Sequence, residues 1–321
     1  MTNQDKSIGG YFELELPQRA EYHKAAIALN TGRNALEYIL RARGYKRVFL
    51  PYYSCEVLLE PFNKLGVEYS FYHINDRLEL DKPVTLKDDE ALLCINYFGL
   101  KQEYILRLAS IYGKQLIVDN TQAFYAKPID GIDTFYSCRK FFGVADGAYL
   151  YSEARLDDAF KEACSWDRMD YLLKRIDVSP ESAYRDFQAQ DEALVNNPIR
   201  TMSRLTHRIL MSIDYEKVAQ RRRQNYLFLD NALKDKNGIS LPLADDAVPM
   251  VYPFLSDVED IRQRCIENKI YVARYWPNVL NWCDNGCYDY QLTKHLLALP
   301  VDQRYGQEEM KRIIKVIPEW I

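Results

Sequence analysis

Residues 115–151 read QLIVDNTQAFYAKPIDGIDTFYSCRKFFGVADGAYLY, and this stretch decides the fold of the chain. Short apolar runs bounded by turn residues are typical of buried strands. We predict three of them here, at residues 115–118, 133–137 and 147–151. The first strand delivers Asp119 at its end, and the second delivers Ser137 and then Lys140. Because ligands bind beyond the carboxyl ends of the strands in an open α/β sheet, an acid and an amine are placed at a ligand-binding edge.

The neighbours of Asp119 and Lys140 favour a chemical role over a structural one. A single Asp at a strand end is more often a turn or helix cap, and a single Lys is usually solvated. Here Gln122 follows Asp119 by three positions, and Ser137 precedes Lys140 by three. The two phenylalanines that follow Lys140 are expected to shield its amine partly from water. Together these features indicate a working site.

Upstream of this stretch, strands alternate with helices. Thr31 and Gly32 open a predicted helix that ends at Gly44. We expect further strands at residues 47–50, 67–73 and 91–97, and further helices at residues 57–65 and 103–112. Strands that alternate with helices of about ten residues indicate right-handed crossovers and a mostly parallel sheet. The sequence therefore predicts an α/β fold.

The chain changes character after residue 151. Residues 156–233 contain no glycine and are predicted to be mainly helical, with a turn at 196–198 and a long helix over 215–234. Beyond Gly238 we expect two strands, at residues 250–254 and 270–274, and two helices, at residues 257–268 and 307–317. This pattern predicts a large domain, residues 1–215, and a smaller C-terminal α+β domain, residues 216–321.

The composition is that of an ordinary soluble protein. The 321 residues are 48% hydrophobic and 27% charged, with a net charge of −4. The dense basic run, Arg221 to Arg223, lies inside the predicted long helix, so we expect a solvated helix face and no nucleic-acid partner.

Cysteine spacing and hydropathy exclude further classes. Cys283 and Cys287 are four positions apart without a second Cys or His pair at zinc-site spacing, so no metal site is predicted. No segment approaches the roughly 18 apolar residues of a membrane span, and the first residues lack a signal-peptide pattern. We therefore expect a cytoplasmic protein without a membrane partner.

The helix that opens at Thr31-Gly32-Arg33 offers a candidate phosphate site. Free backbone N–H groups and the helix dipole attract anions to such a terminus, although a simple N-cap is the more common role. Neither G-x-G-x-x-G nor G-x-x-x-x-G-K-[ST] occurs at a strand end. An anion site, a carboxylate and an amine at one sheet edge fit pyridoxal 5'-phosphate, which needs all three.

At these residues the chain resembles the fold-type I pyridoxal phosphate enzymes, and specifically the DegT/StrS-type sugar-nucleotide aminotransferases. The similar segments are TGRNAL at 31–36, DNTQA at 119–123, SCRK at 137–140 followed by Gly147, YVARYWP at 271–277 and LALPVDQRYGQEEMKRIIKVI at 297–317. Three departures stand out. Asp146-Gly147-Ala148 replaces a Glu-Gly-Gly, the serine lies closer to Lys140 than is usual, and Cys55 occupies the position of the aromatic residue that stacks on the ring.

The resemblance implies a three-layer αβα fold and transamination of a keto sugar-nucleotide, with glutamate as donor, in polysaccharide biosynthesis. Lys140 and Asp119 would be catalytic. The cofactor would be held by Asp119, Lys140 and a further set: Gly32, Arg33, Tyr53, Cys55, Gln122, Ser137 and Asn197. Tyr52 or Tyr53 would replace the missing stacking ring, and Asn197 would come from the partner subunit of a homodimer.

Two alternatives use the same scaffold. One is another carbanion reaction on an amino acid, such as elimination. The other is a non-catalytic binding or regulatory protein, against which the presence of both Lys140 and Asp119 argues.

Overall fold

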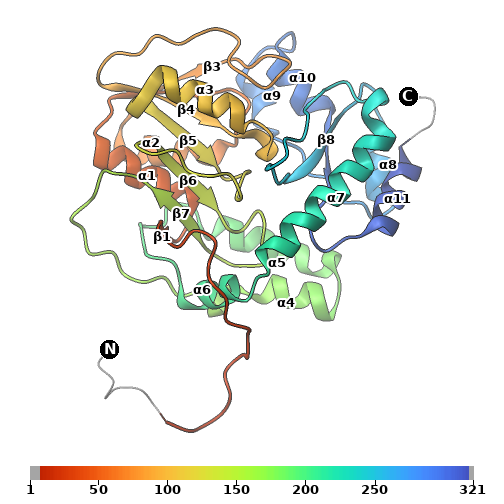
Figure 1. Ribbon diagram of the computed structural model, residues 1–321, viewed down its shortest axis with the longest axis horizontal. Helices are drawn as coiled ribbons and strands as arrows, with labels where there is room; N and C mark the ends of the chain where they lie inside the picture. The colour runs from red at the N-terminus through yellow and green to blue at the C-terminus, as the bar shows by residue number, and fades with distance from the viewer. Residues whose placement is uncertain (1–7, 318–321) are drawn as a thin grey trace.

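The computed structural model describes residues 8–317. A seven-stranded sheet forms the larger part of the molecule, in the order β1-β7-β6-β5-β4-β2-β3 (Figure 1). The strands are β1 Ile27–Leu29, β2 Arg47–Pro51, β3 Glu68–Tyr72, β4 Glu90–Ile95, β5 Leu116–Asn120, β6 Asp133–Ser137 and β7 Ala148–Tyr151. Strand β7 runs antiparallel to its neighbours β1 and β6, while the pairings among β2 to β6 are parallel. The predicted mostly parallel α/β sheet is confirmed.

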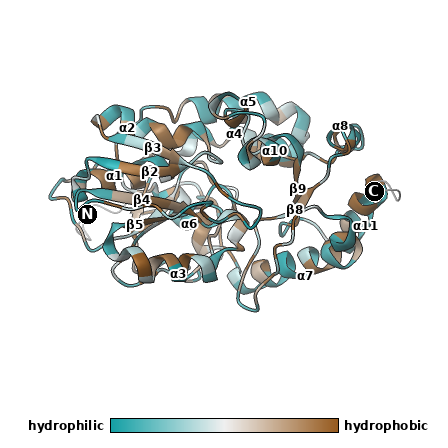
Figure 2. Ribbon diagram, turned by 90° about the horizontal axis from the view of Figure 1, so that it is seen from above, coloured by the Kyte–Doolittle hydropathy of each residue, from teal (hydrophilic) through white to brown (hydrophobic). Residues whose placement is uncertain are grey.

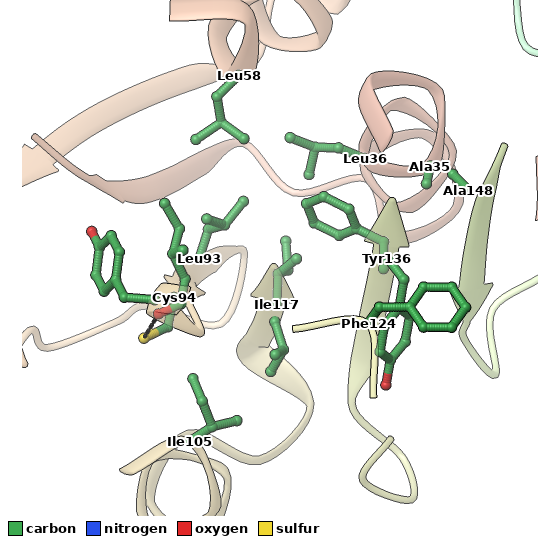
Figure 3. Close-up of a cluster of buried hydrophobic side chains, with 14 of the residues drawn as sticks. Ala35, Leu36, Leu58, Leu93, Cys94, Ile105, Ile117, Phe124, Tyr136 and Ala148 are labelled. Carbon is green, nitrogen blue, oxygen red and sulfur yellow. Dashed lines mark hydrogen bonds between the residues drawn. The ribbon is translucent and has the colours of Figure 1, made fainter. Parts of the chain in front are cut away.

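Helices cover both faces of this sheet. Helix α1, Gly32–Arg43, packs on β6 and β7, and α3, Gln102–Tyr112, packs on β5. Figure 3 shows Leu36 of α1 and Ile105 of α3 on opposite sides of the strands that carry Cys94 and Ile117. All four side chains are at most 2% exposed, so the core fills both spaces between sheet and helices. This is the three-layer αβα arrangement (Figure 2).

Of the remaining helices, α2 lies between β2 and β3 and the others follow the sheet in the chain. They are α2 Glu60–Leu65, α4 Asp170–Asp177, α5 Pro180–Glu192, α6 Arg204–Met211, α7 Tyr215–Leu233, α8 Ile261–Glu267, α9 Val279–Trp282, α10 Tyr288–His295 and α11 Gln307–Val316. Among residues 8–317, no helix is both long and apolar enough to cross a membrane.

A second hydrophobic core lies beside the large sheet, at the right of Figure 1. It contains Tyr226 of α7, Met310 of α11 and the two-stranded antiparallel sheet of β8, Val251–Leu255, and β9, Leu296–Pro300. Trp276 and Val279 lie beyond residue 216 but pack in the larger core. The domain boundary between residues 215 and 216 stays a prediction.

Two strand predictions are wrong. The first strand is β1, Ile27–Leu29, which precedes the predicted first strand at 47–50. Three residues are too few to show a strand period, and β1 exists through its pairing with β7. Residues 270–274 form no strand and make a single bridge, from Ala273 to Ala298. The edge of β8 is paired by β9 instead.

Candidate active site

The ends of β5 and β6 meet the start of α1 on one face of the sheet. Asp119 is paired directly with Phe135, and side chains at paired positions point to the same face. A Cβ added to Gly32 would lie 3.3 Å from Thr121 Cγ2 and 3.9 Å from the Phe135 ring. The start of α1 is therefore in contact with the strand ends that carry Asp119 and Ser137.

Asp119 is a buried carboxylate. It is 5% exposed, and its Oδ1 accepts a hydrogen bond from the Thr121 backbone N–H at 2.7 Å. Burial raises the pKa of Asp119, and the charge of Lys140 and the hydrogen bonds from Thr121 offset this in part. A carboxylate in this position is stabilised by a cationic hydrogen-bond donor.

Lys140 reaches the same loop from β6. Its Nζ donates to Thr121 Oγ1 at 3.0 Å, so Thr121 contacts both Asp119 and Lys140. The Lys140 side chain is exposed, and the expected shielding by Phe141 and Phe142 is wrong. Both rings turn into the core, because their backbone N–H groups bond to Cys138 O and close a tight turn.

The first turn of α1 presents backbone donors. Thr31 caps the helix, since its Oγ1 accepts from Asn34 N at 3.1 Å. The N–H groups of Gly32 and Arg33 have no partner within the helix, and the first turn contains no acidic residue. The Arg33 guanidinium pairs with Glu60 at 3.2 Å, so Arg33 offers the site its backbone N–H.

Gln122 carries an unpaired donor. The side chain is fully buried, and its Oε1 accepts from Phe98 N at 2.9 Å. Its Nε2 has no hydrogen-bond partner within residues 8–317. A buried donor without a partner costs about 1–3 kcal/mol. An acceptor on a bound molecule would remove that cost, so this group fits a cofactor beside Asp119.

The candidates for ring stacking differ in position. Tyr53 is fully buried, with its ring 5.0 Å from Trp276 and 5.6 Å from Tyr97 between centroids, and its hydroxyl is unpaired within the described chain. Tyr52 stacks on Phe71 and His73.

Cys55 is half-buried and lies near Lys140. Burial raises the pKa of its thiol, and a hydrogen bond with the Val57 backbone and then the charges of Lys140 and Arg33 partly oppose that shift.

The last two predicted residues lie at the edge of this group. Ser137 is half-buried at the end of β6. Asn197 lies beside α1 of its own chain, where its backbone oxygen accepts from Asn34 Nδ2 at 2.9 Å and its side chain donates to Ala193 O at 2.7 Å. The role assigned to Asn197 of the partner subunit stays a prediction.

Sequence reasoning missed Thr121, Arg222 and Gln303. Thr121 lies within the segment 119–123, but a threonine has no chemical signature that marks it as a partner of lysine. Arg222 and Gln303 both bond to Phe141 O, from 81 and 162 positions away in the chain. No local pattern reports such contacts.

No protein-family model matches the chain, and no curated protein matches it in sequence. Solved structures do match its fold. A DegT DnrJ EryC1 StrS aminotransferase from Brucella abortus is 18% identical with a TM-score of 0.61, over 91% of this chain and 84% of that one. DesV from S. venezuelae, in complex with a ketimine intermediate, is 16% identical with a TM-score of 0.62, over 92% and 84%. TlmJ, an aminotransferase from Streptoalloteichus hindustanus, is 16% identical with a TM-score of 0.62, over 91% and 84%.

This chain therefore has the fold of the DegT/DnrJ/EryC1/StrS aminotransferase structures. The likeness in fold extends over 91% of the chain, and the predicted fold class is confirmed.

Proposed function

We propose that the chain is a pyridoxal 5'-phosphate-dependent aminotransferase that acts on a keto sugar carried by a nucleotide. One observation carries the proposal. The buried Asp119 and the amine of Lys140 meet at Thr121, next to the first turn of α1. Among the structures with this fold, a putative sugar aminotransferase from Streptococcus pneumoniae was solved in a PLP form and a PMP form, at 14% and 16% identity.

The residues present fit the cofactor. The N–H groups of Gly32 and Arg33 and the hydroxyl of Ser137 would bind its phosphate, with Asn197 of the partner subunit completing that site. Asp119 would accept the ring N–H, and the unpaired Gln122 Nε2 would donate to a ring substituent. Cys55 would lie against the ring, with Tyr53 behind it in the core. When bound, pyridoxal phosphate supplies an aldehyde carbon that bonds to amines and a ring that accepts an electron pair.

The chain itself contributes proton transfer and electrostatics. Lys140 Nζ would hold the cofactor at rest, and the amino donor would take its place and free Nζ. The free Nζ would then carry a proton between the substrate carbon and the cofactor carbon. Thr121 Oγ1 would keep Nζ within reach between these steps. Asp119 would hold the ring N–H as a fixed charge shielded from water, which stabilises negative charge developing on the ring.

We infer glutamate as the amino donor, a cytoplasmic location and a homodimer. All seven cysteines are free, which suits a reducing compartment. The dimer is supported by apolar side chains on α4 and α5 that are more than two-fifths exposed: Leu173, Ile176, Tyr184 and Phe187. Exposed patches of this kind mark interaction surfaces.

The half-reaction with glutamate tests this function. Purified protein is mixed with pyridoxal phosphate, and its visible absorption is recorded before and after glutamate is added. We expect an absorption band of the protein-bound cofactor that shifts to the position of the aminated form when glutamate is added, with release of 2-oxoglutarate. The original band should return when keto sugar-nucleotides are supplied. A bound band that never shifts with glutamate would favour elimination chemistry on another amino acid. Protein that binds no cofactor would contradict the proposal.

A further inference from the structure

A buried arginine lies directly behind the turn that carries Lys140. Arg222, on α7, is 2% exposed. Its Nη1 donates to Pro249 O and Met250 O at 3.2 and 3.1 Å, and its Nη2 donates to Phe141 O at 3.4 Å. Its guanidinium also lies over the Phe141 ring, 4.5 Å from the centroid. Both the ring and the carbonyl of Phe141 are therefore covered by one cation.

The acceptors of Arg222 are neutral. Besides the three carbonyl groups, its Nε donates to Gln303 Oε1 at 2.9 Å. The nearby Asp302 forms a two-point ion pair with Arg304 instead. Burial lowers the pKa of Arg222 to about 10, against the opposing charge of Asp302, so the side chain stays charged at neutral pH. A buried cation without a paired carboxylate is costly, and an apolar side chain at this position would avoid that cost.

The bonds of Arg222 and Gln303 converge on the carbonyl of Phe141. Gln303 Nε2 donates to Phe141 O at 2.8 Å, while its Oε1 is held by Arg222. The other end of the turn is fixed to the sheet, because Cys138 N donates to Gly147 O at 3.0 Å. Lys140 lies between these two fixed points of the backbone: Cys138, which is bonded to the sheet, and Phe141, which is bonded to elements outside it.

We propose that Arg222 and Gln303 are positioning residues for Lys140. They fix the Phe141 carbonyl, and through it the backbone from which the Lys140 amine reaches Thr121. Gln303 follows β9, and Arg222 lies on α7, so the turn is held by two elements that also contribute residues to the second core. The part of the proposal that concerns turnover rests on the proposed aminotransferase function. The part that concerns the turn does not.

Amide hydrogen exchange tests the turn in protein without cofactor. The N–H groups of Phe141 and Phe142 both bond to Cys138 O, so their exchange reports opening of this turn. In Arg222→Met we expect exchange at these amides to be at least about tenfold faster, and in Gln303→Leu about threefold faster, because protected amides exchange through local opening. Arg222→Lys, which keeps the charge without the planar fork, should restore part of the protection.

Arg223→Met is the matched control. Arg223 is the next residue of α7, half-buried, and its Nη1 donates to Ala244 O and Ala247 O rather than to the Lys140 turn. Arg223→Met removes arginine-to-carbonyl hydrogen bonds that are partly buried and lie away from the turn, and it should leave the exchange of Phe141 and Phe142 unchanged. Equal exchange in Arg222→Met and wild type, or equal acceleration in Arg223→Met, would overturn the proposal. If Arg222→Met does not fold, Gln303→Leu and Arg222→Lys decide it by the same criterion.

Kinetics test the consequence for Lys140. We expect kcat of the glutamate half-reaction to fall about tenfold in Arg222→Met while KM stays within about twofold, because an amine held out of place affects the chemical step more than binding. Wild-type protein without transaminase activity would contradict the proposed function, and the exchange result would still stand. If exchange is altered but kcat is unchanged, the part of the proposal that concerns the position of the amine is refuted, and the part that concerns the turn stands.

Discussion

Replacing Asp119 by Asn should move stability and cofactor binding in opposite directions. Without cofactor, the wild-type carboxylate is buried, and its Oδ1 bond to Thr121 N is one that an amide oxygen can also accept. The attraction to Lys140 is weakened by the exposure of that lysine. Removal of the buried charge should therefore stabilise the cofactor-free protein by about 1–2 kcal/mol.

The expected change in melting temperature follows from chain length. An unfolding entropy of about 2.1 cal/mol/K per residue gives about 0.67 kcal/mol/K for 321 residues. The cofactor-free Asp119→Asn variant should thus melt about 1.5–3 °C above wild type. With cofactor, the variant loses a charge-assisted hydrogen bond of about 1.5–3 kcal/mol, so its affinity should fall about 10- to 150-fold.

The pH dependence provides an internal check. The pKa of Asp119 is raised above 3.8 in the folded protein, chiefly by burial. In the window between 3.8 and the raised value the folded state binds more protons than the unfolded state, so wild type loses stability as pH rises through it. The advantage of Asp119→Asn should be full above the raised pKa and absent below pH 3.8, as followed by thermal scans. A variant less stable than wild type without cofactor, or one that binds cofactor equally well, would refute the reasoning.

Two further substitutions test the surroundings of the site. Gly99 has φ +76°, and a Cβ there would lie 2.8 Å from Val248 O; Gly99→Ala should cost about 2–4 kcal/mol in urea unfolding, and Gly286→Ala, with no atom within 4 Å of its Cβ, is the control. Equal effects of the two alanines would contradict this packing. Gln122→Glu keeps the acceptor for Phe98 N but replaces the unpaired Nε2 donor. Cofactor affinity should fall at least about tenfold by fluorescence titration, and an unchanged affinity would show that Gln122 does not contact the cofactor.

The site residues that the sequence predicted best are those carried by local motifs. Asp119 lies at the end of β5 and Lys140 follows β6, and the two side chains come together because the carboxyl ends of these adjacent parallel strands lie side by side. The N-cap at Thr31 and the C-cap at Gly44 are equally local, and both are confirmed.

What the sequence did not predict depends on contacts between distant segments. Strand β1 is three residues long and is defined by its partner β7. The rings of Phe141 and Phe142 turn inward because of one carbonyl, Cys138 O, which no hydrophobicity pattern reports. Arg222 was expected on a solvated helix face, and it is buried because acceptors from three other segments surround it.

Chemical trapping of the cofactor tests the central assignment most directly. Protein incubated with pyridoxal phosphate is reduced with borohydride, digested and analysed by mass spectrometry, with Lys140→Ala and Lys101→Ala prepared in parallel. Lys101 pairs with Glu79 at 2.9 Å and serves as the control lysine. The reduced cofactor should be found on the peptide that contains Lys140, in wild type and in Lys101→Ala, and should be absent from Lys140→Ala. Attachment at another lysine, or equal labelling of Lys140→Ala, would contradict the account.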